Sequence, residues 1–275
     1  YGLLPTKEFF EKGSFTLISD QFSSNQTKDI SSYGSMKDFL LGNSFSKASS
    51  TDLDIPLLLN SKILEAAESF HSFVDKWKPS SGIKTLSIFG SGLTTTRGIR
   101  YEADKHCESS CGMSFSPIMS KRGDGTVLTR SNSGNSDEIS FLDLGALKID
   151  KKGNVQHANI LESIVLTDKI KDIITETPSS GKDYERYFSS VEPVYDDEVL
   201  TIKVYSPVDI HIYDKEGNHT GPVENPGRWN AYETYENNID GGFYWSFNGR
   251  KMVQLPYDGE HQIVFAFSIP GRARR

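Results

Sequence analysis

The pattern that most constrains the fold lies after Pro193, where the sequence has the alternation that is typical of β-strands. Polar and apolar residues alternate there, as in strands with one buried and one solvent-facing side. Turn-forming clusters such as Asn248-Gly249 separate the alternating segments. The segments are 199–205, 208–213, 242–247, 251–255 and 261–267. Residues 193–275 are therefore predicted to form a small antiparallel β-sandwich.

The preceding part of the chain has a different rhythm. Apolar residues between Leu59 and Trp77 recur every three or four positions, which predicts one long helix. Two predicted strands and a second predicted helix follow, at 83–89, 142–149 and 158–174. Helix, strand and glycine turn in alternation are typical of a parallel sheet with crossover helices. The stretch 97–122 is predicted to be a long, irregular loop.

These patterns divide the chain into three predicted parts. Residues 1–175 form the helix-and-strand part, and the first 50 residues, polar but studded with Leu and Phe, suit a lid or cap over a core. Residues 176–192 contain Thr-Pro-Ser-Ser-Gly-Lys-Asp, a composition typical of a linker. Residues 193–275 form the predicted sandwich.

The charge balance argues against nucleic acid as the main partner. The chain has 37 acidic and 30 basic residues, a net charge of −7, and no basic stripe of the kind that binds phosphates. No apolar run reaches the roughly 18 to 20 residues that span a bilayer. The chain begins Tyr-Gly-Leu-Leu-Pro without a basic leader, so we interpret it as a piece of a longer protein with any export signal upstream. An extracellular or cell-surface location is favoured.

Two cysteines lie close together in the predicted loop, in His106-Cys107-Glu-Ser-Ser-Cys111. A small disulfide loop, two free thiols and a metal site with His106 all fit this spacing, although the metal site would lack a fourth ligand. The sequence does not decide among the three. We predict no cofactor and no metal.

The residues that suggest chemistry are Gly123-Asp124-Gly-Thr-Val127 and, further along, His157. In acyl transfer a histidine takes the proton of the nucleophile and returns it to the leaving group, while a carboxylate on its far nitrogen holds the tautomer. Flanking glycines let a turn close tightly around the acid. The order of acid and then histidine is that of α/β-hydrolases, in which the serine comes first. Asp124 and His157 are therefore the predicted acid and base.

The surroundings of this pair resemble a known family. Ile-Phe-Gly-Ser-Gly-Leu-Thr-Thr-Thr at 88–96, Gly-Asp-Gly-Thr-Val-Leu-Thr-Arg-Ser at 123–131 and His-Ala-Asn-Ile-Leu-Glu-Ser at 157–163 are similar to the lecithin:cholesterol acyltransferase and phospholipid:diacylglycerol acyltransferase family and its lipase-like bacterial relatives. The resemblance covers about residues 1–175. It implies that the matched Asp124 is the acid of a catalytic triad and the matched His157 its base.

The family carries its nucleophile on a G-x-S-x-G elbow, and this sequence has no such motif. Ser35 and Ser91 are the serines most similar to that motif, and neither has the two glycines at the motif's positions, two residues before and two residues after the serine. The predicted fold class is therefore α/β: the C-terminal portion of an α/β-hydrolase, with a cap segment and the last strands and helices of a mostly parallel sheet, followed by the sandwich. The serine and the oxyanion-hole donors would lie upstream, and the isolated chain would be inactive.

The predicted function is the acid/base half of a serine esterase, lipase or acyltransferase that acts on lipid or other ester substrates. The expected partners are that substrate, the upstream part of the same hydrolase and, peripherally, a membrane or lipid surface. The rival interpretation is a non-catalytic binding or structural protein with a degenerate hydrolase-like region and a functional sandwich, since fold resemblance does not guarantee function. On this reading Asp124 is an ordinary turn residue and His157 a surface residue.

Overall fold

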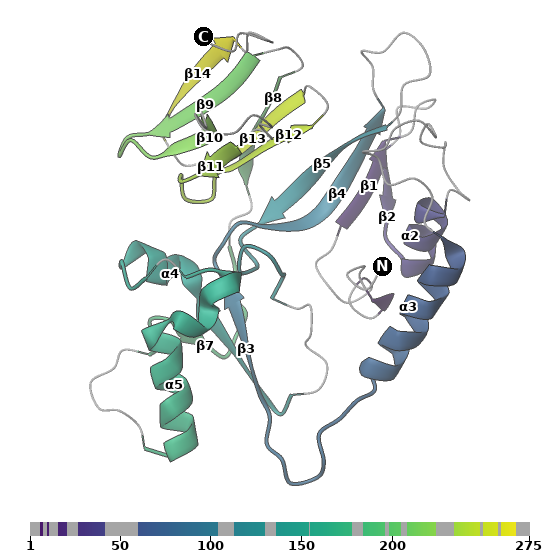
Figure 1. Ribbon diagram of the computed structural model, residues 1–275, viewed down its shortest axis with the longest axis vertical. Helices are drawn as coiled ribbons and strands as arrows, with labels where there is room; N and C mark the ends of the chain where they lie inside the picture. The colour runs from purple at the N-terminus through teal and green to yellow at the C-terminus, as the bar shows by residue number, and fades with distance from the viewer. Residues whose placement is uncertain are drawn as a thin grey trace, which may run out of the picture. The chain divides into compact units, whose positions relative to one another are not determined.

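The computed structural model forms two compact units, Tyr1–Tyr195 and Asp196–Arg275, each of which is described separately (Figure 1). The structure describes residues 6–7, 10, 16–20, 27–41, 60–103, 113–129, 136–153, 155–177, 184–195, 198–204, 208–223, 234–247, 250–257 and 260–267. No helix in these ranges is long and apolar enough to cross a membrane.

A four-stranded sheet in the order β2-β1-β4-β5 forms one part of the first unit. Its strands are β1 (Thr16–Asp20), β2 (Thr27–Ile30), β4 (Thr95–Ala103) and β5 (Met113–Ser120). β1 runs parallel to β4, and the other two pairings are antiparallel. Ile30 and Tyr101 from this sheet are buried together with Met36, so the sheet shares a core with the following helix.

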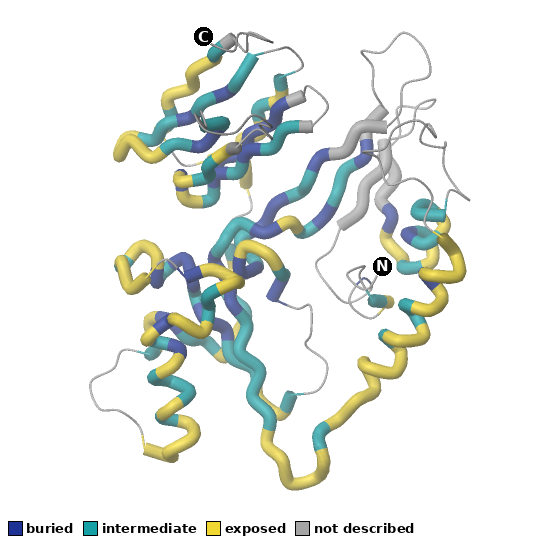
Figure 2. The backbone as a smooth tube through the Cα atoms, viewed as in Figure 1, coloured by how far each residue is buried: buried dark blue, intermediate teal, exposed yellow. Residues whose placement is uncertain are grey.

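Two helices accompany this sheet, α2 (Tyr33–Leu40) and α3 (Ser61–Val74). α2 begins in a capping box, in which Ser32 Oγ accepts from the Ser35 N–H and Ser35 Oγ from the Ser32 N–H. α3 is capped by Asn60, whose Oδ1 accepts from the backbone N–H groups of Lys62 and Ile63. α3 is mostly exposed along its length, as the colouring of Figure 2 shows.

A second, smaller sheet has the order β3-β6-β7. It consists of β3 (Leu86–Ser91), β6 (Glu138–Asp143) and β7 (Phe188–Ser189), and it is accompanied by α4 (Leu144–Ile149), the 3₁₀ helix η1 (His157–Glu162) and α5 (Ile164–Thr175). β3 and β6 are parallel, and β7 is antiparallel to β6. Leu142, Leu144, Leu147 and Leu166 form the buried centre of this part, so strand and helices pack as one cluster.

The second unit contains two antiparallel sheets, ordered β11-β10-β9-β14 and β12-β13-β8. The strands are β8 (Val199–Val204), β9 (Val208–Asp214), β10 (His219–Val223), β11 (Thr234–Asn237), β12 (Phe243–Phe247), β13 (Arg250–Pro256) and β14 (His261–Phe267). Ile210 and Ile212 from one sheet are buried with Tyr244, Val253 and Leu255 from the other. Two sheets around one core is the arrangement of a β-sandwich.

The predicted fold class, an α/β-hydrolase portion with a mostly parallel sheet, is wrong. Among the described strands only β1–β4 and β3–β6 pair in parallel, and every other pairing is antiparallel. The predicted loop 97–122 contains most of β4 and the whole of β5, which pair antiparallel. The alternation of helices and strands in the sequence therefore does not correspond to one continuous parallel sheet.

Two other segments also differ from the sequence-based prediction. The apolar run 142–149 was predicted to be one strand, but β6 ends at Asp143, whose side chain accepts from the Ala146 N–H at 2.8 Å and begins α4. An apolar run of this length fits a strand or a buried helix, and the capping carboxylate decides between them. Within 176–192, predicted to be a linker, β7 pairs with β6.

Candidate acid–base site

Asp124 sits in a tight turn that follows β5. Its Oδ1 accepts two backbone hydrogen bonds, from the Thr126 N–H at 3.0 Å and the Val127 N–H at 2.8 Å. Its own N–H donates to the Val127 carbonyl at 3.2 Å. A carboxylate that bonds the backbone two and three residues ahead forms its own turn, so the side chain is fixed by its immediate neighbours.

The turn is held against the end of β3. Leu93 forms a parallel bridge with Asp124, and the Leu93 N–H donates to the Gly123 carbonyl at 3.0 Å. A Cβ at Gly90 would lie 2.8 Å from Asp124 Cβ, so only a glycine admits this approach without displacing the acid. The carboxylate is consequently buried and its position is set by the end of β3.

His157 begins η1 and is linked twice to Asp124. Its backbone N–H donates to the Asp124 carbonyl at 3.1 Å, and its Nδ1 lies 2.7 Å from Asp124 Oδ2. The acid side chain is 11% exposed and the imidazole 47%, so the carboxylate faces inwards while the ring reaches solvent. The structure thus brings together the two residues that the sequence singled out.

The contact with Asp124 determines which nitrogen of the neutral imidazole carries the proton. Because Asp124 Oδ2 accepts the Nδ1 proton, the neutral imidazole has its lone pair on Nε2. Among the described residues, Nε2 has no hydrogen-bond partner. A half-exposed imidazole nitrogen with a buried carboxylate behind it is the arrangement that accepts a proton from a nucleophile and stabilises the resulting imidazolium.

Comparison with known protein families, curated proteins and solved structures found no match. The case for this site therefore rests on its own geometry.

Ser91, one of the two look-alike serines, is unsuited to act as the nucleophile. It is fully buried at the end of β3, and its hydroxyl lies 3.3 Å from the Leu142 carbonyl and 2.9 Å from the Tyr195 hydroxyl. Burial raises the pKa of Tyr195 to about 12, so the phenol stays protonated and donates to Ser91. Ser35 is engaged in the α2 capping box.

The glycine before the acid is required by packing. A Cβ at Gly123 would lie 2.4 Å from Thr95 Oγ1 and 2.7 Å from the Val127 carbonyl oxygen. Thr95 cannot retreat, because it is fully buried and its hydroxyl donates to the Leu93 carbonyl and accepts from the Gly125 N–H, both at 2.9 Å.

We therefore expect Gly123→Ala to lower the free energy of unfolding by about 1–3 kcal/mol, the usual cost of overpacking. Urea denaturation of the protein measures this change in the free energy of unfolding of the first unit. Gly34→Ala is the matched control, since its nearest neighbour would be 4.0 Å away and alanine favours the helix. Equal unfolding free energies for Gly123→Ala and the wild type would contradict this account of the turn.

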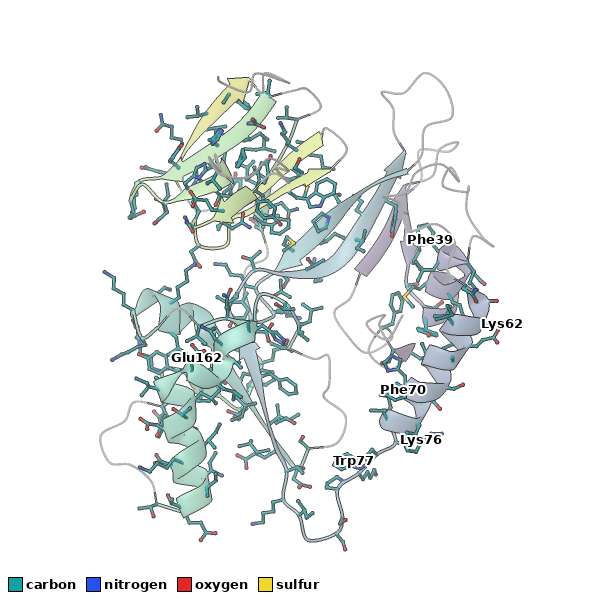
Figure 3. The ribbon with its side chains drawn as sticks, viewed as in Figure 1. Phe39, Lys62, Phe70, Lys76, Trp77 and Glu162 are labelled. Atoms are coloured by element: carbon teal, nitrogen blue, oxygen red, sulfur yellow. The ribbon has the colours of Figure 1, made fainter. Side chains whose placement is uncertain are left out.

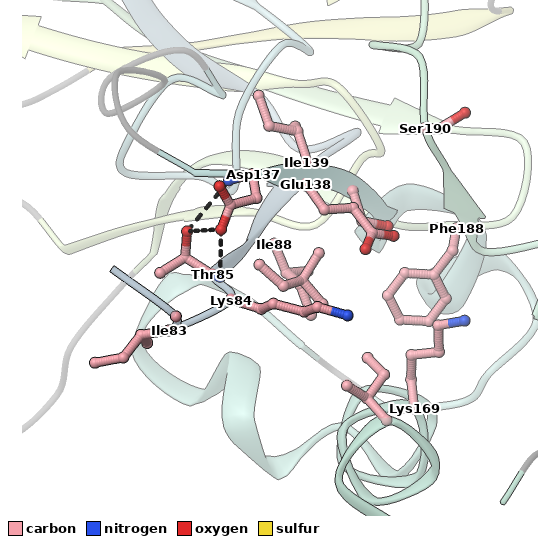
Figure 4. A pocket seen from close by; sticks show the side chains of 14 residues that line it. Ile83, Lys84, Thr85, Ile88, Asp137, Glu138, Ile139, Lys169, Phe188 and Ser190 are labelled. Atoms are coloured by element: carbon pink, nitrogen blue, oxygen red, sulfur yellow. Dashed lines mark hydrogen bonds between the residues drawn. The ribbon is translucent and has the colours of Figure 1, made fainter. Parts of the chain in front are cut away.

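One cleft in the described part of this unit lies elsewhere. It has a volume of about 920 Å³ and lies over the first residues of β3 and β6 and beside α5 (Figure 4). Asp137 Oδ2 accepts there from the Thr85 N–H at 2.9 Å and from the Thr85 hydroxyl at 3.1 Å. Neither Asp124 nor His157 lines this cleft, so it does not supply the acid–base pair with a substrate pocket.

A second cluster of titratable groups, which the sequence did not reveal, lies in the second unit. His219 Nδ1 is 2.6 Å from Glu236 Oε1, and its Nε2 is 3.0 Å from His211 Nδ1. Burial, with the neighbouring His219 and Lys251, lowers the pKa of His211, although Asp209 opposes the shift. The three residues come from β9, β10 and β11. Because β10 and β11 were not predicted as strands, their side chains could not be placed together.

His106, Cys107 and Cys111, for which the sequence leaves a disulfide, free thiols and a metal site open, lie outside the described residues. Within those residues no group of three or more His, Cys, Asp or Glu side chains is arranged to hold a metal ion.

Proposed function

We propose that Asp124 and His157 are the acid and base of a site that transfers or hydrolyses acyl groups of ester substrates. The observation that carries the proposal is the 2.7 Å contact between Asp124 Oδ2 and His157 Nδ1, with the carboxylate 11% and the imidazole 47% exposed. The resemblance around both residues to acyltransferases and lipases supports the same chemistry.

In this proposal the base works in two half-reactions. His157 Nε2 takes the proton of a serine hydroxyl as the oxygen attacks the ester carbonyl, and then protonates the departing alcohol. In the second half, the same nitrogen deprotonates water or an acceptor alcohol, which releases the acyl group. Asp124 keeps its charge throughout and stabilises the imidazolium.

The nucleophile is proposed to lie outside residues 1–275, on a G-x-S-x-G element of the full-length protein. The absence of that motif in the sequence and the buried, engaged state of Ser91 support this placement. The donors that stabilise the oxyanion belong with that element, because its backbone N–H after the serine supplies one of them.

A fluorophosphonate probe tests the proposal on the full-length protein. We expect one serine to be labelled, and His157→Ala to reduce the labelling rate by about 10³-fold or more, because the hydroxyl loses its base. Glu162→Ala is the control, since Glu162 is exposed at the opposite end of helix η1 from His157 and has no role in the chemistry that we assign; Figure 3 labels it. Labelling that persists in His157→Ala would reject the assignment.

A further inference from the structure

Helix α3 carries an apolar stripe that faces solvent. Ile63, Phe70, Phe73 and Val74 fall within about 100° of the helix circumference at 3.6 residues per turn. Trp77 lies three residues after the end of α3, and its N–H donates to the Val74 carbonyl at 3.0 Å. We call these five residues the α3 stripe. Their exposed fractions are 48%, 62%, 75%, 44% and 64% in chain order.

A stripe of this width normally faces a protein core. Here a different side of the helix packs against the rest of the first unit. Leu64 is buried there, and Glu68 forms an ion pair of 2.8 Å with Lys37 of α2. The α3 stripe lies on the side away from Glu68, so α3 is anchored and still presents its apolar side chains outwards.

The charges around the α3 stripe have one sign. Lys62 borders it in the helical projection, and Lys76 and Lys78 lie on either side of Trp77 in the chain; all three are exposed. The acidic residues of this segment project to the opposite side of the helix: Glu65, Glu68 and Asp75. Figure 3 shows Lys62 near the start of α3 and Phe70, Lys76 and Trp77 towards and beyond its end.

We propose that the α3 stripe lies on an anionic phospholipid surface, with the helix in the plane of the interface. Aromatic side chains favour the boundary between headgroups and acyl chains, and bordering lysines pair with lipid phosphates. A second copy of the chain fits less well. Two stripes facing each other about a twofold axis would bring lysines against lysines.

Vesicle sedimentation with residues 1–275 tests this surface. The wild type binds vesicles of phosphatidylcholine mixed with phosphatidylglycerol, and Trp77 fluorescence shifts to the blue; Trp77→Phe identifies this signal. The triple variant Phe70→Ser/Phe73→Ser/Trp77→Ser reduces the partition coefficient by about tenfold or more. Because all three side chains are exposed, the variant keeps its fold, which circular dichroism verifies.

A second variant tests the charges. Lys62→Glu/Lys76→Glu/Lys78→Glu reduces binding to the anionic vesicles by about tenfold or more and leaves binding to pure phosphatidylcholine unchanged. Two matched controls keep wild-type binding. Ile173→Ser/Ile174→Ser removes exposed apolar residues from α5, and Lys151→Glu/Lys152→Glu/Lys171→Glu makes the same charge change away from α3.

The inference is overturned if the wild type does not sediment with anionic vesicles, or if the serine triple variant binds as well as the wild type. It is also overturned if the wild type is a dimer in analytical ultracentrifugation that the serine variant dissolves. His157→Ala binds vesicles like the wild type, so the acid–base site and the lipid surface succeed or fail separately.

Discussion

Asp124→Asn is expected to lower kcat for ester hydrolysis by the full-length protein by about 10⁴-fold, equivalent to about 5 kcal/mol of transition-state stabilisation. Asparagine keeps an oxygen for the Thr126 and Val127 N–H groups, so the turn is preserved. Its amide group, however, donates towards His157 Nδ1. The imidazole proton then moves to Nε2, and the base can no longer accept a proton from the nucleophile.

The measurement is the steady-state hydrolysis of a p-nitrophenyl ester, with kcat and KM determined separately. KM should change little, because the substitution leaves the exposed side of the imidazole intact. Asp137→Asn is the matched control, as Asp137 is another carboxylate of the first unit that accepts a backbone hydrogen bond, from Thr85. If Asp124→Asn retained a tenth of the wild-type kcat or more, Asp124 would be only a turn residue.

The second large effect is expected in the other unit, where Lys251 on β13 pairs with Asp209 on β9 and so links the two sheets. Lys251 is 5% exposed and Asp209 22%. Lys251→Met should lower the free energy of unfolding by about 3 kcal/mol, the lower end of the range for a broken buried pair, because Asp209 retains some contact with water.

Urea unfolding in a Trp77→Phe background measures this change, since the remaining tryptophans, Trp229 and Trp245, both belong to the second unit. Lys203→Met is the control at an exposed position of β8. Lys251→Met/Asp209→Leu should regain most of the lost stability, because both charges are removed together. A loss below about 1 kcal/mol for Lys251→Met would place the pair among ordinary surface ion pairs.

The sequence was informative where local pattern and tertiary structure agree. Five alternating segments after Pro193 are present as β8, β9, β12, β13 and β14. β10 and β11 escaped prediction because they are short, and β10 contains Gly221 and Pro222, two residues that strands normally avoid. Each depends on a neighbouring strand, β10 on β9 and β11 on β10, which periodicity within one segment does not report.

The sheets of the first unit could not be derived in the same way. β1 and β4 are neighbours in the sheet but lie far apart in the sequence, and nothing in their residues specifies this pairing. The segment 97–122 was misread because the alternation of β4 is interrupted at Arg97, between Thr96 and Gly98, where the register with β5 shifts. An irregular strand of this kind resembles a loop in the sequence.

The candidate site was accessible from the sequence for a physical reason. Glycines around an aspartate encode a turn that the carboxylate itself closes, so the local chemistry of 123–127 makes the acid recognisable in the sequence, and the end of β3 then sets its position. The α3 stripe shows the opposite case. Its spacing predicts an amphipathic helix, but only the structure shows that the apolar side faces outwards.

In the proposed reaction, the double connection between His157 and Asp124 also determines which partner must move. One hydrogen bond joins the main chains of the two residues and holds the backbone of His157, and another joins their side chains and holds the imidazole. The ring is therefore aligned before any substrate arrives, and its ordering entropy is not lost during the reaction. Adjustment of the reacting atoms falls to the nucleophile and the ester, which approach a base that is already in place.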